Sequence, residues 1–152
     1  MKKIYLLYLL ALVLVSSSCI EQNYPKWEGS LLEFQDAVIN SPVAGETYPR
    51  ITVANTVGTV SLRVNLVGAH RASDEIIMYS AMTVGTTAVS GRDYTMTGKL
   101  TIPKGSSFGT LTVNIINTGR IGGSVDLLLQ IDGNDEIGYN SNYNKVQLRI
   151  TR

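Results

Sequence analysis

Apolar side chains recur at every second position over much of this chain. The clearest case is the segment 60–66, where valine and leucine alternate with serine, arginine and asparagine. The segments 111–115, 125–131 and 146–150 show the same alternation. In an extended chain, residues two positions apart lie on the same face, so this alternation puts the apolar side chains together on one face. Such a pattern is typical of a half-buried β-strand. We therefore expect a protein built mainly of strands.

Four further segments complete the expected set of strands: 31–34, 50–54, 75–83 and 98–103. Turn-forming clusters separate them, and no segment combines a helical apolar stripe with capping residues. Seven or eight short strands with frequent turns predict an all-β antiparallel sandwich. Two sheets are expected because each strand has one apolar face that needs cover. The order of the strands does not follow from the sequence.

The N-terminal segment has the composition of a bacterial export signal. Lys2 and Lys3 precede an apolar run at 4–15, and serines follow at 16–18. An apolar helix of that length rises about 18 Å, which is short of the roughly 30 Å hydrocarbon core of a bilayer. We therefore predict a signal peptide at 1–18, followed by a tether at 19–30 and the sandwich domain at 31–152.

The serines that end in Cys19 resemble the lipobox of bacterial lipoproteins, in the looser form of Bacteroidetes that tolerates Ser16 in place of leucine. The resemblance implies that Cys19 becomes the first mature residue and carries fatty acyl chains, so that the membrane is a partner. It also implies the outer membrane, because no aspartate follows Cys19. It leaves open whether the domain faces the periplasm or the cell surface. The alternative is an ordinary secreted protein with a free thiol at Cys19.

The charge balance and the single cysteine exclude several classes of protein. Removal of residues 1–18 leaves 134 of the 152 residues, enough for one domain with a core. Two lysines leave with the signal, so 13 basic residues become 11 against 12 acidic ones, and we expect no nucleic acid partner. With Cys19 acylated, the domain has no thiol for a disulfide or a thiolate metal site. No cofactor is expected.

Three consecutive segments resemble the Calx-beta domain pattern. They read TTAVSGRDY at 86–94, GKLTIPKG at 98–105 and GTLTVNI at 109–115. The resemblance implies an immunoglobulin-like sandwich. The residues themselves fit it, because Asp93 can bond nearby backbone N–H groups and Tyr94 can bury its ring. The whole chain is similar to uncharacterised Calx-beta-like lipoproteins of Bacteroidetes. That family has no settled activity, although such proteins often accompany outer-membrane machinery for glycan capture.

Calcium is an obvious ligand to consider, because some Calx-beta domains hold Ca²⁺ in acidic loops. Here the acidic run that usually follows the alternating strand is replaced by 119–124, which has no carboxylate. The acidic segment 132–136 fails as an EF-hand loop, because Ile137 and Tyr143 stand where glycine and glutamate are required. We interpret it as a hairpin with Asp132-Gly133 as turn residues. One alternative remains, a site formed by convergence of Asp93, Asp132, Asp135 and Glu136.

No residue set in the sequence specifies a reaction. The segment 105–109 matches the G-x-S-x-G pattern of a nucleophile elbow, but a strand rather than a helix is expected after it. His70, the only histidine, lies in a turn cluster with nothing to mark it as paired. One histidine without a free thiol also disfavours zinc. We therefore predict a protein that is not an enzyme and has no catalytic residues.

The segment 139–143 is the candidate ligand-binding loop. Tyrosine rings stack on sugar rings and asparagine amides bond hydroxyl groups, so Tyr139, Asn140, Asn142 and Tyr143 suit a glycan. The alternative is a structural connection into the last strand. Our first hypothesis is a binding module that serves glycan capture and presents these aromatic residues on one loop end. The second is an adaptor lipoprotein that docks an outer-membrane protein complex, and a Ca²⁺-dependent module comes third.

Overall fold

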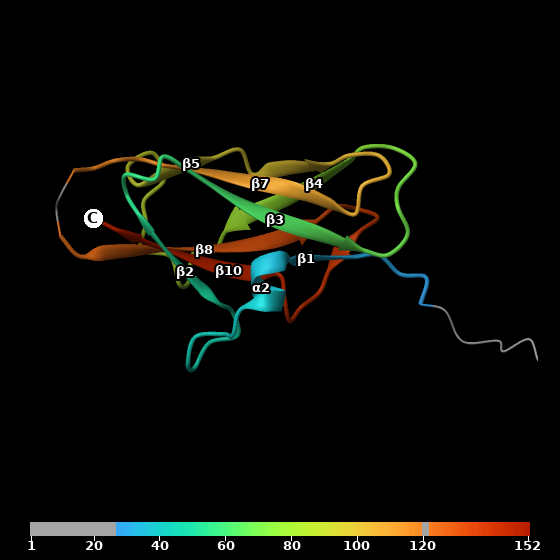
Figure 1. The fold of residues 1–152 in the computed structure, drawn as a ribbon, viewed down its shortest axis with the longest axis horizontal. Coiled ribbons are helices and arrows are strands. Elements are labelled where there is room, and N and C mark those ends of the chain that lie inside the picture. Colours follow the sequence, from blue (N-terminus) through green and yellow to red (C-terminus); the bar gives the residue numbers. More distant parts are fainter. Residues whose placement is uncertain (1–26, 120–121) are drawn as a thin grey trace, which may run out of the picture.

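The computed structural model describes residues 27–119 and 122–152. It contains two sheets of five strands and one short helix (Figure 1). In chain order the elements are β1 (Leu31–Phe34), α2 (Gln35–Ile39), β2 (Arg50–Ala54), β3 (Thr59–Val67), β4 (Glu75–Ala81), β5 (Tyr94–Met96), β6 (Lys99–Ile102), β7 (Phe108–Ile115), β8 (Ser124–Gly133), β9 (Gly138–Tyr139) and β10 (Lys145–Thr151). None of the helices among these residues is long and apolar enough to cross a membrane.

The two sheets face each other as a sandwich, which confirms the predicted all-β class. The first sheet has the order β5-β7-β3-β1-β9 and the second has the order β2-β10-β8-β4-β6. Most neighbours are antiparallel. At one edge of each sheet, however, a short strand pairs in parallel: β9 with β1, and β2 with β10. The described residues therefore hold two more strands than the eight expected, β5 and β9, which have three and two residues.

The alternation in the sequence sets which side chains form the core. Along β7, exposed and buried residues alternate without a break, and β3 follows almost the same pattern. The central strand β8 is different, because Leu127, Leu128 and Leu129 are all buried. Leu128 faces outward, where Gly85 in the segment after β4 covers it. Burial of apolar side chains between the two sheets is the main stabilising term for such a fold.

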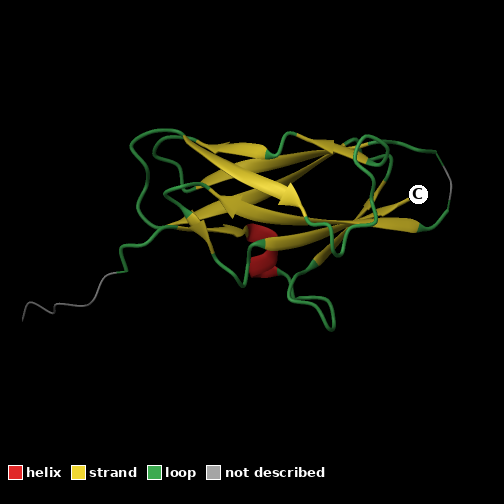
Figure 2. Cartoon of the chain, turned by 180° about the vertical axis from the view of Figure 1, so that it is seen from behind, coloured by secondary structure: helices red, strands yellow, loops and turns green. Residues whose placement is uncertain are grey.

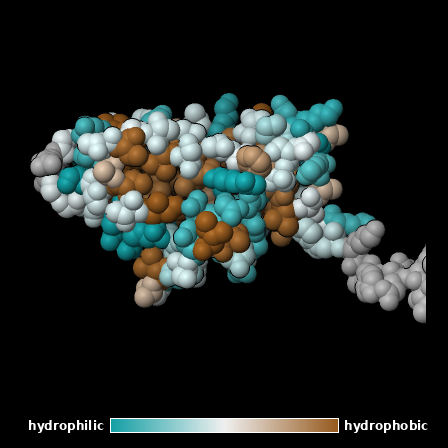
Figure 3. All heavy atoms as spheres, in the orientation of Figure 1, coloured by the Kyte–Doolittle hydropathy of each residue, from teal (hydrophilic) through white to brown (hydrophobic). Residues whose placement is uncertain are grey.

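No segment of the sequence combines a helical stripe with capping residues, and the described residues contain one short helix, α2. It has five residues, and Phe34 at its N-cap offers no side-chain hydrogen bond. Ala37 is its buried residue, whereas Val38 and Ile39 are exposed. Figure 3 shows apolar surface at the position of α2. So short a helix depends on tertiary packing rather than on its own propensity.

The predicted turn at Asp132-Gly133 is also wrong. Strand β8 continues through Gly133, and the connection to β9 runs from Asn134 to Ile137. The Asn134 N–H donates to the carbonyl oxygen of Ile137 at 3.0 Å, and its side-chain oxygen accepts from the Ile137 N–H at 2.7 Å. Asparagine often closes a turn in this way, through its own side chain.

Many of the loops lie at the two ends of the sandwich, whereas the loop near α2 protrudes from its side (Figure 2). One end, here called the tether end, holds Trp27 and the connections 68–74, 103–107 and 134–137. The opposite end, here called the far end, holds the connections 55–58 and 116–123, the segment 89–93 and Arg152. Figure 1 shows the C-terminus at the far end.

Candidate functional site

Three of the four candidate binding residues lie in a strap, Asn140–Tyr143, which joins β9 of one sheet to β10 of the other, and the fourth, Tyr139, ends β9 directly before the strap. The Asn140 N–H donates to the Leu32 carbonyl oxygen at 2.9 Å. At the other end of the strap, the Phe34 N–H donates to the Tyr143 carbonyl oxygen at 2.8 Å. Both ends of the strap are therefore fixed to β1.

The strap is also closed internally as a turn. The Tyr143 N–H donates to the Asn140 carbonyl oxygen at 3.0 Å, and the Asn142 N–H donates to the Asn140 side-chain oxygen at 3.1 Å. One oxygen of Asn140 thus shapes the backbone, while Asn142 is exposed. The sequence did not distinguish these roles, because both asparagines suit either a turn or a ligand.

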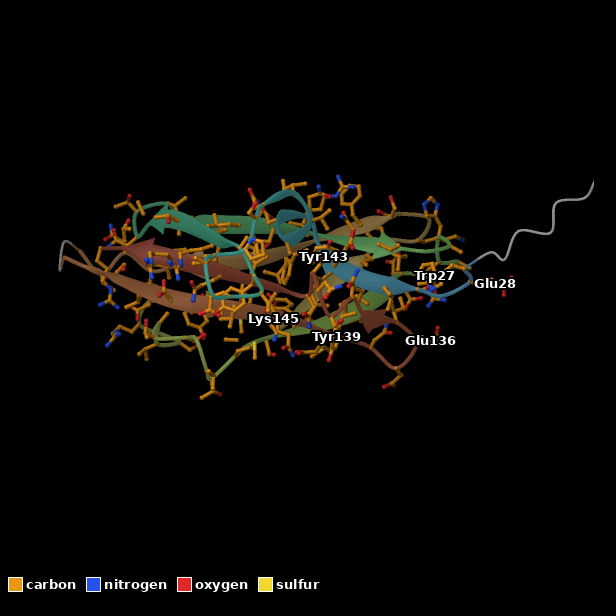
Figure 4. The ribbon with its side chains drawn as sticks, turned by 90° about the horizontal axis from the view of Figure 1, so that it is seen from below. Trp27, Glu28, Glu136, Tyr139, Tyr143 and Lys145 are labelled. Atoms are coloured by element: carbon orange, nitrogen blue, oxygen red, sulfur yellow. The ribbon has the colours of Figure 1, made fainter. Side chains whose placement is uncertain are left out.

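Two aromatic rings flank the strap and remain accessible. Tyr139 is 42% exposed and Tyr143 is 37% exposed. Figure 4 shows both tyrosines on the side of the sandwich, whereas Trp27 and Glu28 lie near the tether end. The expectation of a site on one loop end is therefore wrong, because the strap runs beside β1 along the edge of the sandwich.

A second cluster surrounds Asp93 at the far end, and we call it the Asp93 cluster. The carboxylate is 1% exposed and accepts hydrogen bonds from the Val89 N–H at 2.8 Å, from Arg92 Nη2 at 2.9 Å and from Arg152. The bond from Val89 confirms that Asp93 caps backbone N–H groups. Burial raises the pKa of Asp93, but the bonds from Arg92, Val89 and Arg152 outweigh it and hold the pKa below its usual value. Tyr94 is buried beside it, as expected.

The four acids considered for calcium do not converge. Asp93 lies at the far end and is already paired with two guanidinium groups. Asp132 accepts hydrogen bonds from Ser80 and Gln130 on the outer face of the second sheet. Asp135 and Glu136 belong to the 134–137 connection at the tether end. Across residues 27–119 and 122–152, no three or more His, Cys, Asp or Glu side chains lie together in a way that could hold a metal ion. These residues do not fit the calcium site that a Calx-beta resemblance implies.

A paired carboxylate on β8 was not found by sequence reasoning. Arg149 donates from Nε and Nη2 to the two oxygens of Asp126, both at 2.8 Å, across the β8–β10 pair. The bonds from Arg149 lower the pKa of Asp126, burial raises it, and the positive charges of Arg149 and Arg50 lower it further, so that it lies below the usual value. Asp126 and Arg149 satisfy each other's charge and hydrogen bonds, so this pair is a poor candidate for binding a ligand.

The G-x-S-x-G pattern has a structural explanation. Residues 105–107 form a connection, and Phe108 and Gly109 begin β7, so a strand follows as expected. A Cβ atom at Gly109 would lie 2.5 Å from the Thr101 carbonyl oxygen of β6 in the opposite sheet. This glycine therefore allows close approach of two strands. His70 is an exposed residue of the 68–74 connection, and within the described part of the chain its side chain makes no hydrogen bond or ion pair.

No protein-family model and no curated protein matches the sequence. Solved structures resemble its fold. The apo form of the Calx CBD1 domain has a TM-score of 0.58 at 15% identity, over 82% of this chain and 100% of that domain. The calcium binding domain CBD12 of CALX1.1 has a TM-score of 0.55 at 15% identity, over 67% of this chain and 41% of that one. A Bacteroides ovatus protein of unknown function has a TM-score of 0.53 at 18% identity, over 80% and 45%.

At these identities the likeness concerns the fold alone. This chain spans less than half the length of CBD12 and of the Bacteroides ovatus protein. The comparisons confirm a Calx-beta-like sandwich, which the motifs at 86–94 and 98–105 indicated. What it binds has to be argued from its own side chains.

Proposed function

We propose that this chain is a non-enzymatic, lipid-anchored binding module of the outer membrane that captures carbohydrate on its strap. One observation carries the proposal: two accessible tyrosine rings flank a strap that is fixed to β1 at both ends. Stacking on a sugar needs an aromatic face at a defined position. A strap that is already ordered loses little conformational entropy when a ligand binds.

The chemistry of the strap matches a hydroxyl-rich ligand. Tyr139 and Tyr143 each combine an apolar ring with a hydroxyl group, and exposed Asn142 carries an amide that both donates and accepts. The nearest charged side chain along the chain is Lys145, so the strap itself is neutral. Neutral, ring-shaped and polyhydroxylated ligands therefore suit it better than ions.

The anchor is a separate part of the proposal. Cys19 lies outside the described residues, and its acylation stays a prediction from the lipobox resemblance. The chain enters the sandwich at the tether end, since Trp27–Ser30 directly precede β1. Because the strap runs along the side of the sandwich, a membrane at the tether end would leave it accessible. The test is Cys19→Ala: we expect a chain that is neither acylated nor cleaved before residue 19 and that is lost from the outer-membrane fraction, and unchanged processing and fractionation would contradict the anchor.

The adaptor function is a second candidate, supported by the apolar surface of α2. Val38 is 44% exposed and Ile39 is 64% exposed, on the helix that directly follows β1. An adaptor would bury this surface against an outer-membrane protein. Val38→Ser with Ile39→Ser would then abolish co-purification with that protein and would leave carbohydrate binding unchanged.

The decisive experiment for the first function is a polysaccharide panel that includes plant and host glycans, probed with the full chain in detergent micelles. We expect binding to at least one neutral polysaccharide, weakened about tenfold or more by Tyr139→Ala with Tyr143→Ala. The matched control is Tyr139→Phe with Tyr143→Phe, which keeps both rings and should retain most of the affinity. Absence of binding across the panel would overturn carbohydrate capture.

A further inference from the structure

The outer face of the first sheet carries an arginine in an unusual setting. The Arg63 guanidinium carbon of β3 lies 3.9 Å from the centroid of the Phe108 ring on β7. Its Nε donates to the Asn65 side-chain oxygen at 2.9 Å, and Asn65 Nδ2 donates to the Gln35 side-chain oxygen at 2.8 Å. An aromatic ring and an amide therefore hold the guanidinium plane in place, as cation–π and charge-assisted contacts do. We call these four residues the Arg63 platform.

The Arg63 platform has no carboxylate partner among the described residues. Arg63 takes part in none of the ion pairs found in 27–119 and 122–152, and its side-chain hydrogen bond there runs from Nε. The two terminal nitrogens thus keep the fork that binds a carboxylate through two parallel bonds. In the strands of this sheet the only other charged residue is Glu33, which stands opposite Asn65 on β1.

Neutral hydroxyl groups surround the platform on the side away from Glu33. Thr110 of β7 stands directly opposite Arg63, and Ser61 stands opposite Thr112 at the next outward position. All four of these side chains are exposed. The face therefore combines one fixed cation with donors and acceptors suited to sugar hydroxyls. Phe108, 41% exposed, adds an apolar border.

We propose that the Arg63 platform is a second binding site, which takes the carboxylate of an acidic polysaccharide built from uronic acids. Two bonds from the guanidinium hold the carboxylate, and Ser61, Thr110 and Thr112 bond the hydroxyls of neighbouring sugar units. A nucleic acid does not suit the site, because its binding depends on several cations that neutralise successive phosphates. This site lies on different strands from the strap and goes beyond the function proposed for the strap.

The test compares polygalacturonate with its fully methyl-esterified form, which has the same backbone without the charge. Isothermal titration with the full chain in detergent should show binding of polygalacturonate at least tenfold tighter than of the ester, and weaker in higher salt. Arg63→Gln should remove that preference. Arg63→Lys keeps a charge without the planar fork and should fall between the two. Glu33→Gln should tighten binding two- to threefold, because it removes a repelling carboxylate.

Three outcomes overturn the proposal: no measurable binding of polygalacturonate, equal binding of the two polymers, or unchanged affinity of Arg63→Gln for polygalacturonate. Arg63 is exposed, so its substitution should leave the melting temperature unchanged, and the melt checks that lost binding is not lost folding. Tyr139→Ala with Tyr143→Ala separates the two proposals, since it should weaken neutral glycans at the strap and keep the preference for the acidic polymer.

Discussion

The Asp93 cluster and the Arg63 platform both depend on guanidinium groups, yet they use them in opposite ways. At Asp93, one buried carboxylate is shared by Arg92 and Arg152, and these hydrogen bonds come from within the protein itself. At Arg63, a ring and an amide orient the guanidinium without neutralising it. The first arrangement uses charge to hold loops together, and the second leaves charge available to a ligand.

Burial explains the difference. A carboxylate that is 1% exposed has lost its water and needs compensating hydrogen bonds, which three residues, Val89, Arg92 and Arg152, donate. Arg63 stays exposed on the sheet and keeps its hydration, so nothing requires a partner of opposite charge. Removing a charged group should therefore cost stability at the first place and binding at the second.

The largest expected effect is on stability at the far end. Asp93→Ala should lower the free energy of unfolding by about 3 kcal/mol or more, because it leaves the Arg152 guanidinium without its carboxylate. Urea unfolding followed by circular dichroism measures this. Arg63→Gln is the matched charge removal and should change the midpoint little. Comparable losses for the two variants would show that the platform also holds the fold together.

The second largest effect on stability is expected at Gly109, on the strand β7 that also carries Phe108 of the platform. Gly109 pairs with Val64 beside Arg63, and its missing side chain lets β7 approach the Thr101 carbonyl oxygen. Gly109→Ala should therefore cost about 1–3 kcal/mol through overpacking. Gly105→Ala is not a matched control, because Gly105 has a φ of +72° that strains any side chain. Thr110→Ala, on the exposed side of the same strand, is the matched control and should be nearly neutral. A neutral Gly109→Ala would mean that the two sheets can separate locally without cost.

Acid should weaken the Asp93 cluster. The folded pKa of Asp93 lies below its ordinary value, so the folded chain binds fewer protons than the unfolded chain near pH 4. The contribution of Asp93 to the free energy of unfolding is therefore complete above about pH 5. It is lost as the pH falls from there through the lowered pKa of the folded state. Asp126 shifts in the same direction with a smaller effect, since it is more exposed.

Urea unfolding at several pH values between 3 and 7 measures this dependence. Asp93→Asn should reduce the loss of unfolding free energy on acidification. Arg63→Gln should show the same dependence of the unfolding free energy on pH as the unsubstituted chain. A slope that Asp93→Asn does not change would mean that other carboxylates dominate the acid response.

The strands were predictable because their signal is local. Alternation identified the long strands β3, β7, β8 and β10, but β5 and β9 are too short to show a period. Helix α2 was missed for the same reason, since five residues without a side-chain cap leave no pattern. The parallel pairing at the sheet edges joins distant segments and leaves no mark in either one.

The candidate sites also differ in whether their residues are neighbours in the sequence. The strap was found because its two tyrosines and its asparagines are consecutive in the sequence. The Asp93 cluster joins residues that are 59 positions apart, so the local segment 86–94 pointed to Asp93 but nothing pointed to Arg152. The Arg63 platform depends on the register of β3 against β7, which places Asn65 opposite Phe108. The alternation along β3 keeps Arg63 on the outer face, but a shift of two residues would keep that face and change the partner of Arg63, and the sequence alone does not exclude such a shift.

The smallest expected effect comes from calcium, and it tests whether the Asp93 cluster is complete. A ligand that binds only the folded state raises stability by RT ln(1 + [L]/Kd), about 2.7 kcal/mol at a hundredfold excess over Kd. The carboxylate of Asp93 already faces two guanidinium groups, and Asp132, Asp135 and Glu136 lie elsewhere. We therefore expect the same melting temperature in millimolar Ca²⁺ as in chelator. A rise that Asp93→Asn abolishes would show that the cation displaces an arginine, and the cluster would then be a ligand site like the platform.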